Sequence, residues 1–161
     1  MIGLVLLFLM SVCFGFIRSS PTEQFVDESG RQVVFHGVNA VFKQAPWFPL
    51  PNASAPFNAS LNENDFQLLS GWGFNFVRLG AMWPGLMPWN ASLPDPSYLQ
   101  ALDEIVSLAR KYGIFVLLDL HQDLLSPFFC GEGAPDYLVP RPDLIAKFPL
   151  PIGMPYKTVS T

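Results

Sequence analysis

Apolar and polar positions follow two different spacings along the chain. Between Gln24 and Phe35, apolar residues on either side of a Ser29-Gly30 pair predict a β-hairpin, and residues 33–39 are expected to continue as a strand. Residues 44–61 are dense in Pro, Asn, Ser and Ala without a usable period, which predicts a long surface loop.

The next segment predicts a helix followed by a strand. The side chain of Asn62 can accept hydrogen bonds from the free N–H groups of a first turn, and Asp65 suits that same turn. Gly71 and Gly73 are expected to end this helix. Residues 74–80, FNFVRLG, are rich in aromatic and β-branched types, as a short strand is.

A longer helix is predicted from Asp95-Pro96, which joins a capping acid to a proline in the first turn. Its buried face is expected to consist of the apolar residues that follow at helical spacing: Leu99, Leu102, Ile105, Val106, Ala109 and Tyr112. Gly113 suits the left-handed position after the last turn. The apolar run at 114–120, IFVLLDL, predicts a parallel strand covered on both faces.

This order of hairpin, strand, helix, strand, helix and strand predicts an α/β fold with right-handed crossovers and a parallel sheet. The expected strand ends, Asn39, Gly80 and His121, lie 41 residues apart. That spacing favours a (β/α)₈ barrel, of which the chain would hold the N-terminal hairpin and about the first three βα units. Because no glycine-rich phosphate loop follows any strand, a nucleotide-binding sheet is disfavoured.

Composition and charge narrow the functional classes. The chain has 161 residues, of which 50% are apolar and 14% are charged, and its net charge is −4. These values fit one packed domain rather than a disordered acidic tail. Because Lys and Arg form no basic patch, a nucleic-acid partner is not expected.

Residues 1–20 are expected to form a secretory signal peptide, with residues 21–161 as the domain that follows. Residues 1–16 form one apolar run, which is short against the roughly 20 residues of a membrane-spanning helix. Cleavage is expected after Gly15 or near Ser20, and a signal anchor remains the alternative. The chain is therefore expected to be secreted or endolysosomal.

Three sequons agree with that route. Asn52, Asn58 and Asn90 each begin an Asn-x-Ser tripeptide in a polar or proline-rich stretch, and each is expected to be N-glycosylated. Cys130 would be the single cysteine left after cleavage, which suggests either a buried thiol or a partner that the sequence does not supply.

Charged residues on the predicted strands are the first candidates for chemistry. Strand alternation turns Arg78 toward one face of the sheet, and a charge inside a barrel needs a partner. Asp119 on the neighbouring strand is expected to be that partner, with a structural role, whereas Arg78 can serve structure or function. His121 ends its strand at the rim where barrel enzymes place their active sites.

The loop after His121 carries three acids, Asp123, Glu132 and Asp136. A glycosidase usually catalyses hydrolysis with two carboxyl groups, and Asp123 and Glu132 could be proposed as such a pair. Hydrogen bonding to substrate or a role in loop structure is the preferred interpretation of these acids. No metal or other cofactor is expected, because His36 and His121 are the only histidines and neither has a second ligand at helical or loop spacing.

Three runs carry a resemblance to a known family: HGVNAVFKQAPW at 36–47, GWGFNFVRLGAMWPGLMP at 71–88, and LLDLHQDLLSPFFCGEGAPDY at 117–137. They resemble the endoglycoceramidase branch of glycoside hydrolase family 5 over about residues 25–155. The resemblance implies a retaining β-glycosidase that cleaves between the glycan and the ceramide of a glycosphingolipid. Some relatives act on glucosylceramides or steryl glucosides, so the partner is a glycolipid, and peripheral contact with membrane lipid stays open.

The resemblance also assigns roles to residues. Arg78 and His121 match the family's active-site shell, and Lys43 and Asp123 look like its sugar-contacting positions. Asn39, together with Asp119, is expected to support the same rim.

The family's two catalytic glutamates belong to an Asn-Glu motif ending strand four and to strand seven. This chain offers only Asn62-Glu63, which starts a helix, so neither catalytic residue is expected within it. The chain is therefore expected to be the N-terminal part of such an enzyme and inactive by itself.

A non-catalytic secreted module that binds a glycan or lipid is the alternative. The rim residues together with aromatic loops around Trp47, Trp83 and Trp89 would supply its surface. Selective binding on a glycan or lipid array would distinguish such a module from a fragment without a folded rim.

Overall fold

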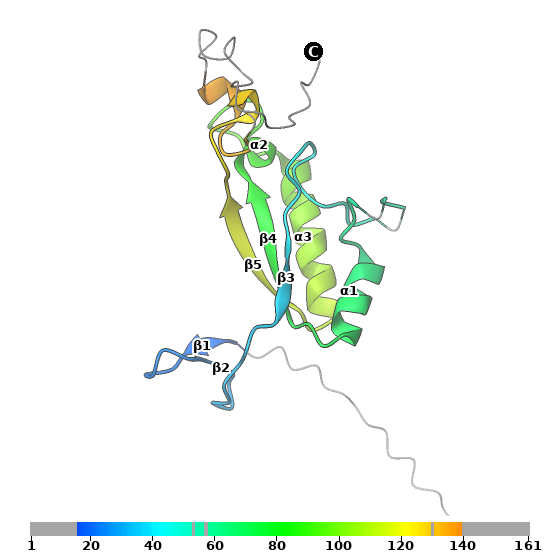
Figure 1. Ribbon diagram of the computed structural model, residues 1–161, viewed down its shortest axis with the longest axis vertical. Coiled ribbons are helices and arrows are strands. Elements are labelled where there is room, and N and C mark those ends of the chain that lie inside the picture. The colour runs from blue at the N-terminus through cyan, green and yellow to red at the C-terminus, as the bar shows by residue number, and fades with distance from the viewer. Residues whose placement is uncertain (1–15, 53, 57, 130, 140–161) are drawn as a thin grey trace, which may run out of the picture. The chain divides into compact units, whose positions relative to one another are not determined.

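The computed structural model describes residues 16–52, 54–56, 58–129 and 131–139, and it divides into two units, residues 1–35 and residues 36–161. Each unit has its own sheet, shown in Figure 1. The predicted signal peptide lies outside the described residues as far as residue 15, and so does Cys130. No helix in the described part of the chain is long and apolar enough to cross a membrane.

The first unit contains the predicted hairpin. β2 (Phe25–Val26) leads into a turn in which Gly30 donates its backbone N–H to Asp27, and Val33 returns to donate to Phe25 at 2.8 Å. The second arm bridges back to Val26 without forming a regular strand.

An additional short strand, β1 (Arg18–Ser19), pairs antiparallel with β2 and was not predicted. It lies inside the expected signal segment. Of the two expected cleavage positions, only the one after Gly15 would retain this pairing.

The second unit is built on a parallel sheet in the order β3-β4-β5. The strands are β3 (Gly37–Ala40), β4 (Phe76–Met82) and β5 (Phe115–His121). The helices α1 (Glu63–Gly71) and α3 (Pro96–Lys111) lie on the same side of the sheet in Figure 1. The predicted alternation is thus confirmed, although the strands begin one to four residues later than expected.

Short helical turns complete this unit. A four-residue helix, α2 (Trp83–Leu86), follows β4 directly, and two 3₁₀ turns, Pro127–Phe129 and Asp136–Leu138, lie in the loop after β5. None of the three was predicted, because segments this short carry no usable hydrophobic period.

The ends of both long helices are determined by the capping residues that the sequence predicted. The Asn62 carboxamide accepts hydrogen bonds from the N–H groups of Asn64 and Asp65, and the Asp65 carboxylate accepts one from the N–H of Asn62. This reciprocal capping box satisfies donors that an uncapped first turn leaves open. Asp95 caps α3 through the N–H of Ser97, and Gly113 has a φ of +71° after its last turn.

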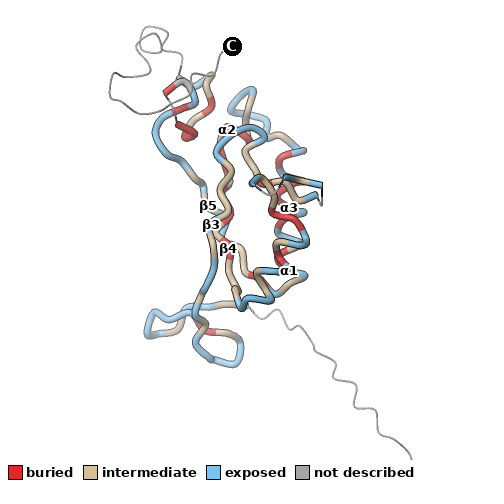
Figure 2. The backbone as a smooth tube through the Cα atoms, turned by 45° about the vertical axis from the view of Figure 1, so that its right-hand side comes forward, coloured by how far each residue is buried: buried red, intermediate tan, exposed pale blue. Residues whose placement is uncertain are grey.

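The buried face of α3 differs from the predicted one. Leu99 and Val106 are exposed, and the residues buried against the sheet are Tyr98, Ala101, Leu102, Ile105 and Ala109. The Tyr98 hydroxyl accepts the N–H of Met82 at 2.6 Å and donates to the carbonyl of Trp47 at 3.2 Å. With its polar tip satisfied, the ring can be fully buried, and the helix turns to suit it. Buried positions gather along α3 and the sheet in Figure 2.

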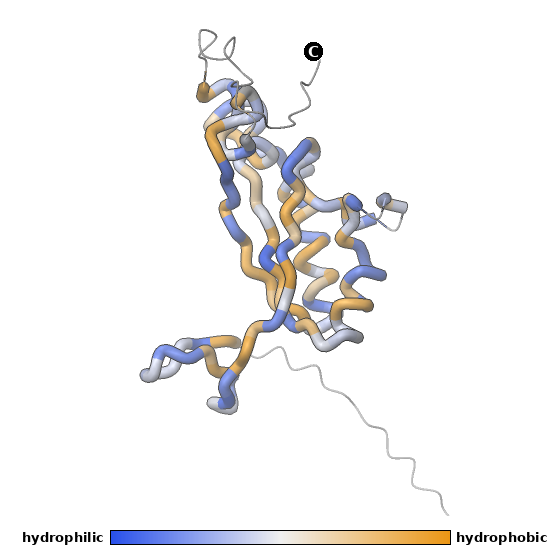
Figure 3. The backbone as a smooth tube through the Cα atoms, viewed as in Figure 1, coloured by the Kyte–Doolittle hydropathy of each residue, from blue (hydrophilic) through white to orange (hydrophobic). Residues whose placement is uncertain are grey.

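The prediction that the third strand is covered on both faces is wrong for the described residues. Leu117, Leu118 and Leu120 are 49%, 55% and 72% exposed. By hydropathy β5 is hydrophobic over its first four residues, with hydrophilic positions only toward its carboxyl end (Figure 3), and within the described part of the sheet β5 pairs only with β4. Apolar side chains therefore accompany a strand edge, a combination that favours association.

Replacing Tyr98 with Phe is expected to lower the free energy of unfolding by about 1–3 kcal/mol, because the buried N–H of Met82 loses its acceptor. Urea unfolding at sub-micromolar protein, followed by tryptophan fluorescence, measures the change. Tyr112→Phe is the matched control, since its hydroxyl contacts Glu63 at the surface. Equal losses in the two variants would contradict the role of the buried hydroxyl.

We expect the chain to self-associate at micromolar concentration through β5. The double variant Leu118→Lys and Leu120→Lys should shift the sedimentation profile toward monomer, because charges on an edge strand oppose edge-to-edge pairing. Leu99→Lys with Val106→Lys places the same charges on exposed positions of α3 and should leave association unchanged. A sharp monomer peak from the unmodified chain would sink this prediction.

Candidate active-site rim

Arg78, Asp119 and His121 share one face of the sheet, opposite the helices. In the parallel register Arg78 lies beside Leu117, and Asp119 lies beside Gly80. The Arg78 Nη2 atom is 2.6 Å from Asp119 Oδ2, so the predicted ion pair forms. Both side chains are mostly shielded from solvent, and each supplies the opposite charge that the other needs.

The same Asp119 oxygen also holds His121. Asp119 Oδ2 lies 2.9 Å from His121 Nδ1, and the imidazole side chain is 12% exposed. The ring's other nitrogen, Nε2, lies 3.3 Å from Asp123 Oδ2 and 3.9 Å from Glu132 Oε1. Because one nitrogen is fixed by Asp119, the other is directed toward the loop that follows β5.

Lys43 closes the cluster from the opposite side. Its ammonium contacts the Asp123 carboxylate and lies 2.8 Å from Glu132 Oε1. Lys43 follows β3 and is 80 positions before Asp123 in the sequence, so the fold brings the two together. Lys43 lowers the pKa of Asp123 below its usual 3.8. In turn, the hydrogen bond from Lys43 to Asp123, followed by the ion pair with Glu132, raises the lysine pKa above 10.5.

Glu132 is the member of this cluster whose place the sequence did not settle. It is 6% exposed, and its N–H donates to the Asp123 carbonyl at 3.0 Å. A Cβ at either neighbouring glycine would lie too close to that turn, 2.7 Å from the Asp123 oxygen at Gly131 and 2.6 Å from the Leu124 oxygen at Gly133. The Gly-Glu-Gly sequence is therefore the signal that marks a close backbone approach at this carboxylate.

Asp123 is not suited to be the acid of an acid and nucleophile pair with Glu132. One ammonium contacts both carboxylates, and Asp123 stays ionised because its pKa is lowered. An ionised carboxylate cannot donate the proton that a leaving group requires. Asp136, the third acid of the loop, starts the 3₁₀ turn Asp136–Leu138 further along.

The remaining predicted residues have simpler surroundings. Asn39 is exposed and lies beside Arg78 in the register of β3 and β4. Of the three tryptophans expected to supply a binding surface, Trp47 packs against the core, Trp83 starts α2 half-buried, and Trp89 is 68% exposed. Trp47 is thus a core-facing residue rather than a free stacking surface.

Oxygen and nitrogen atoms of His121, Asp123 and Glu132 lie within 4.8 Å of one another, a spacing that a metal ion could use. The sequence predicted no metal, since these residues are not at a familiar ligand spacing. The Lys43 ammonium already contacts both carboxylates and supplies the positive charge between them. The arrangement therefore suits hydrogen bonding to a neutral polyhydroxylated ligand.

Comparison with known proteins places this geometry in a family. Residues 26–143 match the cellulase family, glycosyl hydrolase family 5. The chain belongs to glycoside hydrolase family 5.

Two similar proteins indicate which branch of the family the chain resembles. An endoglycoceramidase of Hydra vulgaris is 38% identical over 161 residues, which cover 96% of this chain and 30% of that protein. An endoglycoceramidase of Cyanea nozakii is 45% identical over 118 residues, covering 73% of this chain and 23% of that one. The chain therefore spans less than a third of the length of these relatives.

A solved structure supports the fold. The crystal structure of an endogalactoceramidase matches with a TM-score of 0.56 and 28% identity, over 71% of this chain and 28% of the other. The predicted α/β fold, with the first strands and helices of a (β/α)₈ barrel, is confirmed. The resemblance to the endoglycoceramidase branch is confirmed as well.

Replacing Lys43 with Met is expected to raise the pKa of Asp123 back toward 3.8, because Lys43 is the main cause of its lowering. Carbon-detected NMR titration of the aspartate carboxyls measures this shift. Lys111→Met, which removes the ion pair with Glu63 instead, should leave Asp123 unchanged. An Asp123 titration curve that is the same with and without Lys43 would contradict the contact.

The lowered pKa of Asp123 determines how the stability of the fold changes with pH. Since the folded value lies below the unfolded one, this ion pair stabilises the fold above pH 3.8, and the effect is lost as the pH falls through the folded value. For Lys43 the folded pKa is the higher one, so its contribution is present below pH 10.5 and is lost as the pH rises through the raised value.

Proposed function

We propose that the chain forms the sugar-binding rim of a retaining glycoside hydrolase that cleaves the β-glycosidic bond between the glycan and the ceramide of a glycosphingolipid. The observation that carries this proposal is the continuous cluster from Arg78 through Asp119, His121 and Asp123 to Lys43. It extends along the sheet to His121, the last residue of β5, and to Asp123 and Lys43 in the segments after β5 and β3, which is the end where (β/α)₈ enzymes bind substrate. Relatives that are named endoglycoceramidases support the choice of substrate class.

The cluster suits sugar hydroxyls because it offers donors and acceptors in fixed places. Lys43 brings an ammonium with three donor hydrogens, and Asp123 brings an ionised acceptor beside it. His121 presents Nε2 on the same side, with its ring direction set by Asp119. Because these groups hold one another before a ligand arrives, less side-chain freedom is lost on binding.

Hydrolysis needs a second set of groups. A retaining glycosidase uses two carboxyl groups about 5–5.5 Å apart, one as acid and one as nucleophile. The Lys43 ammonium contacts both Asp123 and Glu132, and the single Asn-Glu pair of the chain lies at the start of α1. We therefore assign the proton donor and the nucleophile to residues outside these 161.

The secretory route is part of the same proposal. A leading apolar run and three exposed sequon asparagines, Asn52, Asn58 and Asn90, support passage through the secretory pathway to a secreted or endolysosomal destination. All three asparagines lie outside helices and strands.

The chain is expected to release no ceramide from a fluorescent ganglioside or glucosylceramide, because it brings no free acid and nucleophile pair. Purified chain and a no-protein control are incubated with each lipid, and free ceramide is measured by chromatography. Ceramide release above the control would overturn the assignment of the catalytic groups to residues outside the chain.

The chain is expected to bind the glycan headgroup of these lipids through the rim. Lys43→Met or Asp123→Asn should weaken that binding about 10- to 100-fold, since hydrogen bonds to charged groups contribute about 1.5–3 kcal/mol each. Vesicles carrying glucosylceramide, ganglioside or steryl glucoside serve as probes in a flotation assay. Vesicles without glycolipid measure any peripheral contact with membrane lipid.

Lys111→Met is the control, because it breaks an exposed lysine and glutamate pair of the same kind on the helical side. Equal weakening by Lys43→Met and Lys111→Met would argue against the rim as the binding surface. No selective binding by the unmodified chain would indicate that the isolated fragment has no folded rim.

A further inference from the structure

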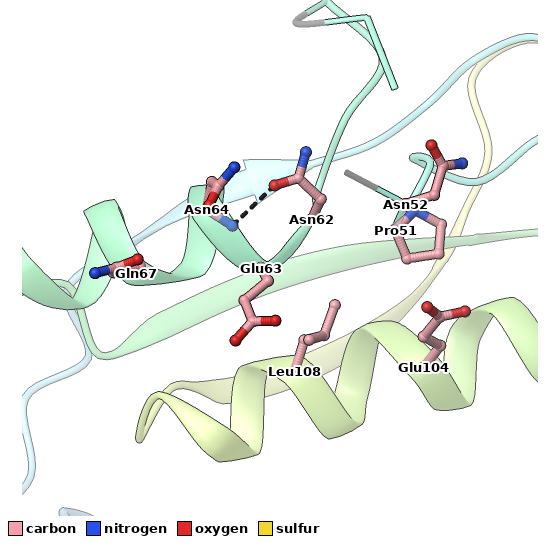
Figure 4. Close-up of a pocket in the computed structure, with 8 residues that line it drawn as sticks. All are labelled: Pro51, Asn52, Asn62, Glu63, Asn64, Gln67, Glu104 and Leu108. Atoms are coloured by element: carbon pink, nitrogen blue, oxygen red, sulfur yellow. Dashed lines mark hydrogen bonds between the residues drawn. The ribbon is translucent and has the colours of Figure 1, made fainter. Parts of the chain in front are cut away.

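A second polar feature lies on the helical side of the sheet. A cavity of about 380 Å³ opens between α1, α3 and the loop before α1. Figure 4 shows Pro51 and Asn52 on that loop, across from Glu104 and Leu108 on α3, with Gln67 on α1. This volume falls within the roughly 300–1,000 Å³ typical of small-molecule sites, and the cavity shares no residue with the rim.

The lining of this cavity matches a neutral sugar. Asn64, Gln67 and Glu104 are exposed and provide amide donors, amide oxygens and a carboxylate. Leu108 and Pro51 add apolar surface on which the C–H face of a pyranose can rest. The carboxylates of Glu63 and Glu104 disfavour an anionic occupant, and Glu63 is held in place by Lys111 and Tyr112.

Asn52 is both a border residue of this cavity and the first residue of a sequon. Its side chain is exposed, and its carboxamide oxygen accepts a hydrogen bond at 2.9 Å from the hydroxyl of Ser54, the serine that completes the sequon. We propose that Asn52 carries an N-linked glycan whose first N-acetylglucosamine occupies the cavity between α1 and α3.

The attachment step balances with a donor that the secretory pathway supplies by class, a lipid-linked oligosaccharyl diphosphate. The Asn52 Nδ2 atom bonds to C1 of the reducing-end sugar and loses one proton. The C1–O bond to the diphosphate breaks, and the lipid diphosphate leaves with that electron pair. The first sugar is then bonded directly to Asn52, a residue that borders the cavity.

Covalent attachment makes a shallow polar site sufficient. A tethered sugar faces the cavity at a high effective concentration, so contacts too weak to capture a free sugar still hold it there. Asn90 is the natural contrast, because its carboxamide oxygen accepts the N–H groups of Ser92 and Leu93 and it does not border this cavity. A glycan at Asn90 would therefore extend from the surface.

The full chain, secreted from a eukaryotic host, provides the test in three forms. One form keeps its glycans, one is trimmed by an endoglycosidase that leaves a single N-acetylglucosamine, and one carries Asn52→Gln. Glycopeptide mass spectrometry determines whether Asn52 is occupied, and hydrogen–deuterium exchange follows residues 63–67 and 104–108. Asn90→Gln is the matched control.

We expect Asn52 to be occupied and the two segments to exchange equally slowly in the intact and trimmed forms. Asn52→Gln should raise their exchange several-fold, and Asn90→Gln should not. The proposal would be overturned if Asn52 were unoccupied, or if the exchange rate of these segments were the same with and without the Asn52 glycan. It would also be overturned if protection disappeared on trimming to one sugar, or if these helices exchanged fast in every form.

Discussion

The Oδ2 atom of Asp119 is the point on which the charged face of this sheet depends. Arg78 on β4 projects from that face, where a guanidinium without an opposite charge would be costly to shield from water. Asp119 lies 2.6 Å from Arg78 and 2.9 Å from His121. One carboxylate therefore links two strands and also decides which way the imidazole points.

That direction has consequences beyond the sheet. Because Asp119 holds Nδ1, the other nitrogen of His121 faces Asp123 and Glu132 in the following loop. These two acids in turn hold Lys43, which follows β3. Groups from all three strands and their loops thus form one connected set, in which removal of Asp119 would take away the ion-pair partner of Arg78 and removal of Lys43 would leave Asp123 and Glu132 without the ammonium that they share. Rigidity of this kind suits a surface that must recognise hydroxyl groups at fixed positions.

The features that the sequence predicted well are the local ones. The capping box of Asn62, the Asp95-Pro96 start and the left-handed Gly113 depend on neighbours a few positions away. Contacts over long distances were harder to predict. Tyr98 is buried because its hydroxyl accepts the N–H of Met82 and donates to the carbonyl of Trp47, whereas periodicity alone favoured Leu99 and Val106.

The same distinction applies to the rim. The pairing of Arg78 with Asp119 follows from alternation on neighbouring strands, and the resemblance supplied Lys43 and Asp123. The place of Glu132 required the loop's backbone geometry, since only the close approach allowed by Gly131 and Gly133 brings its carboxylate to Lys43. Glu132 held in this way is a structural counter-ion that raises the pKa of Lys43.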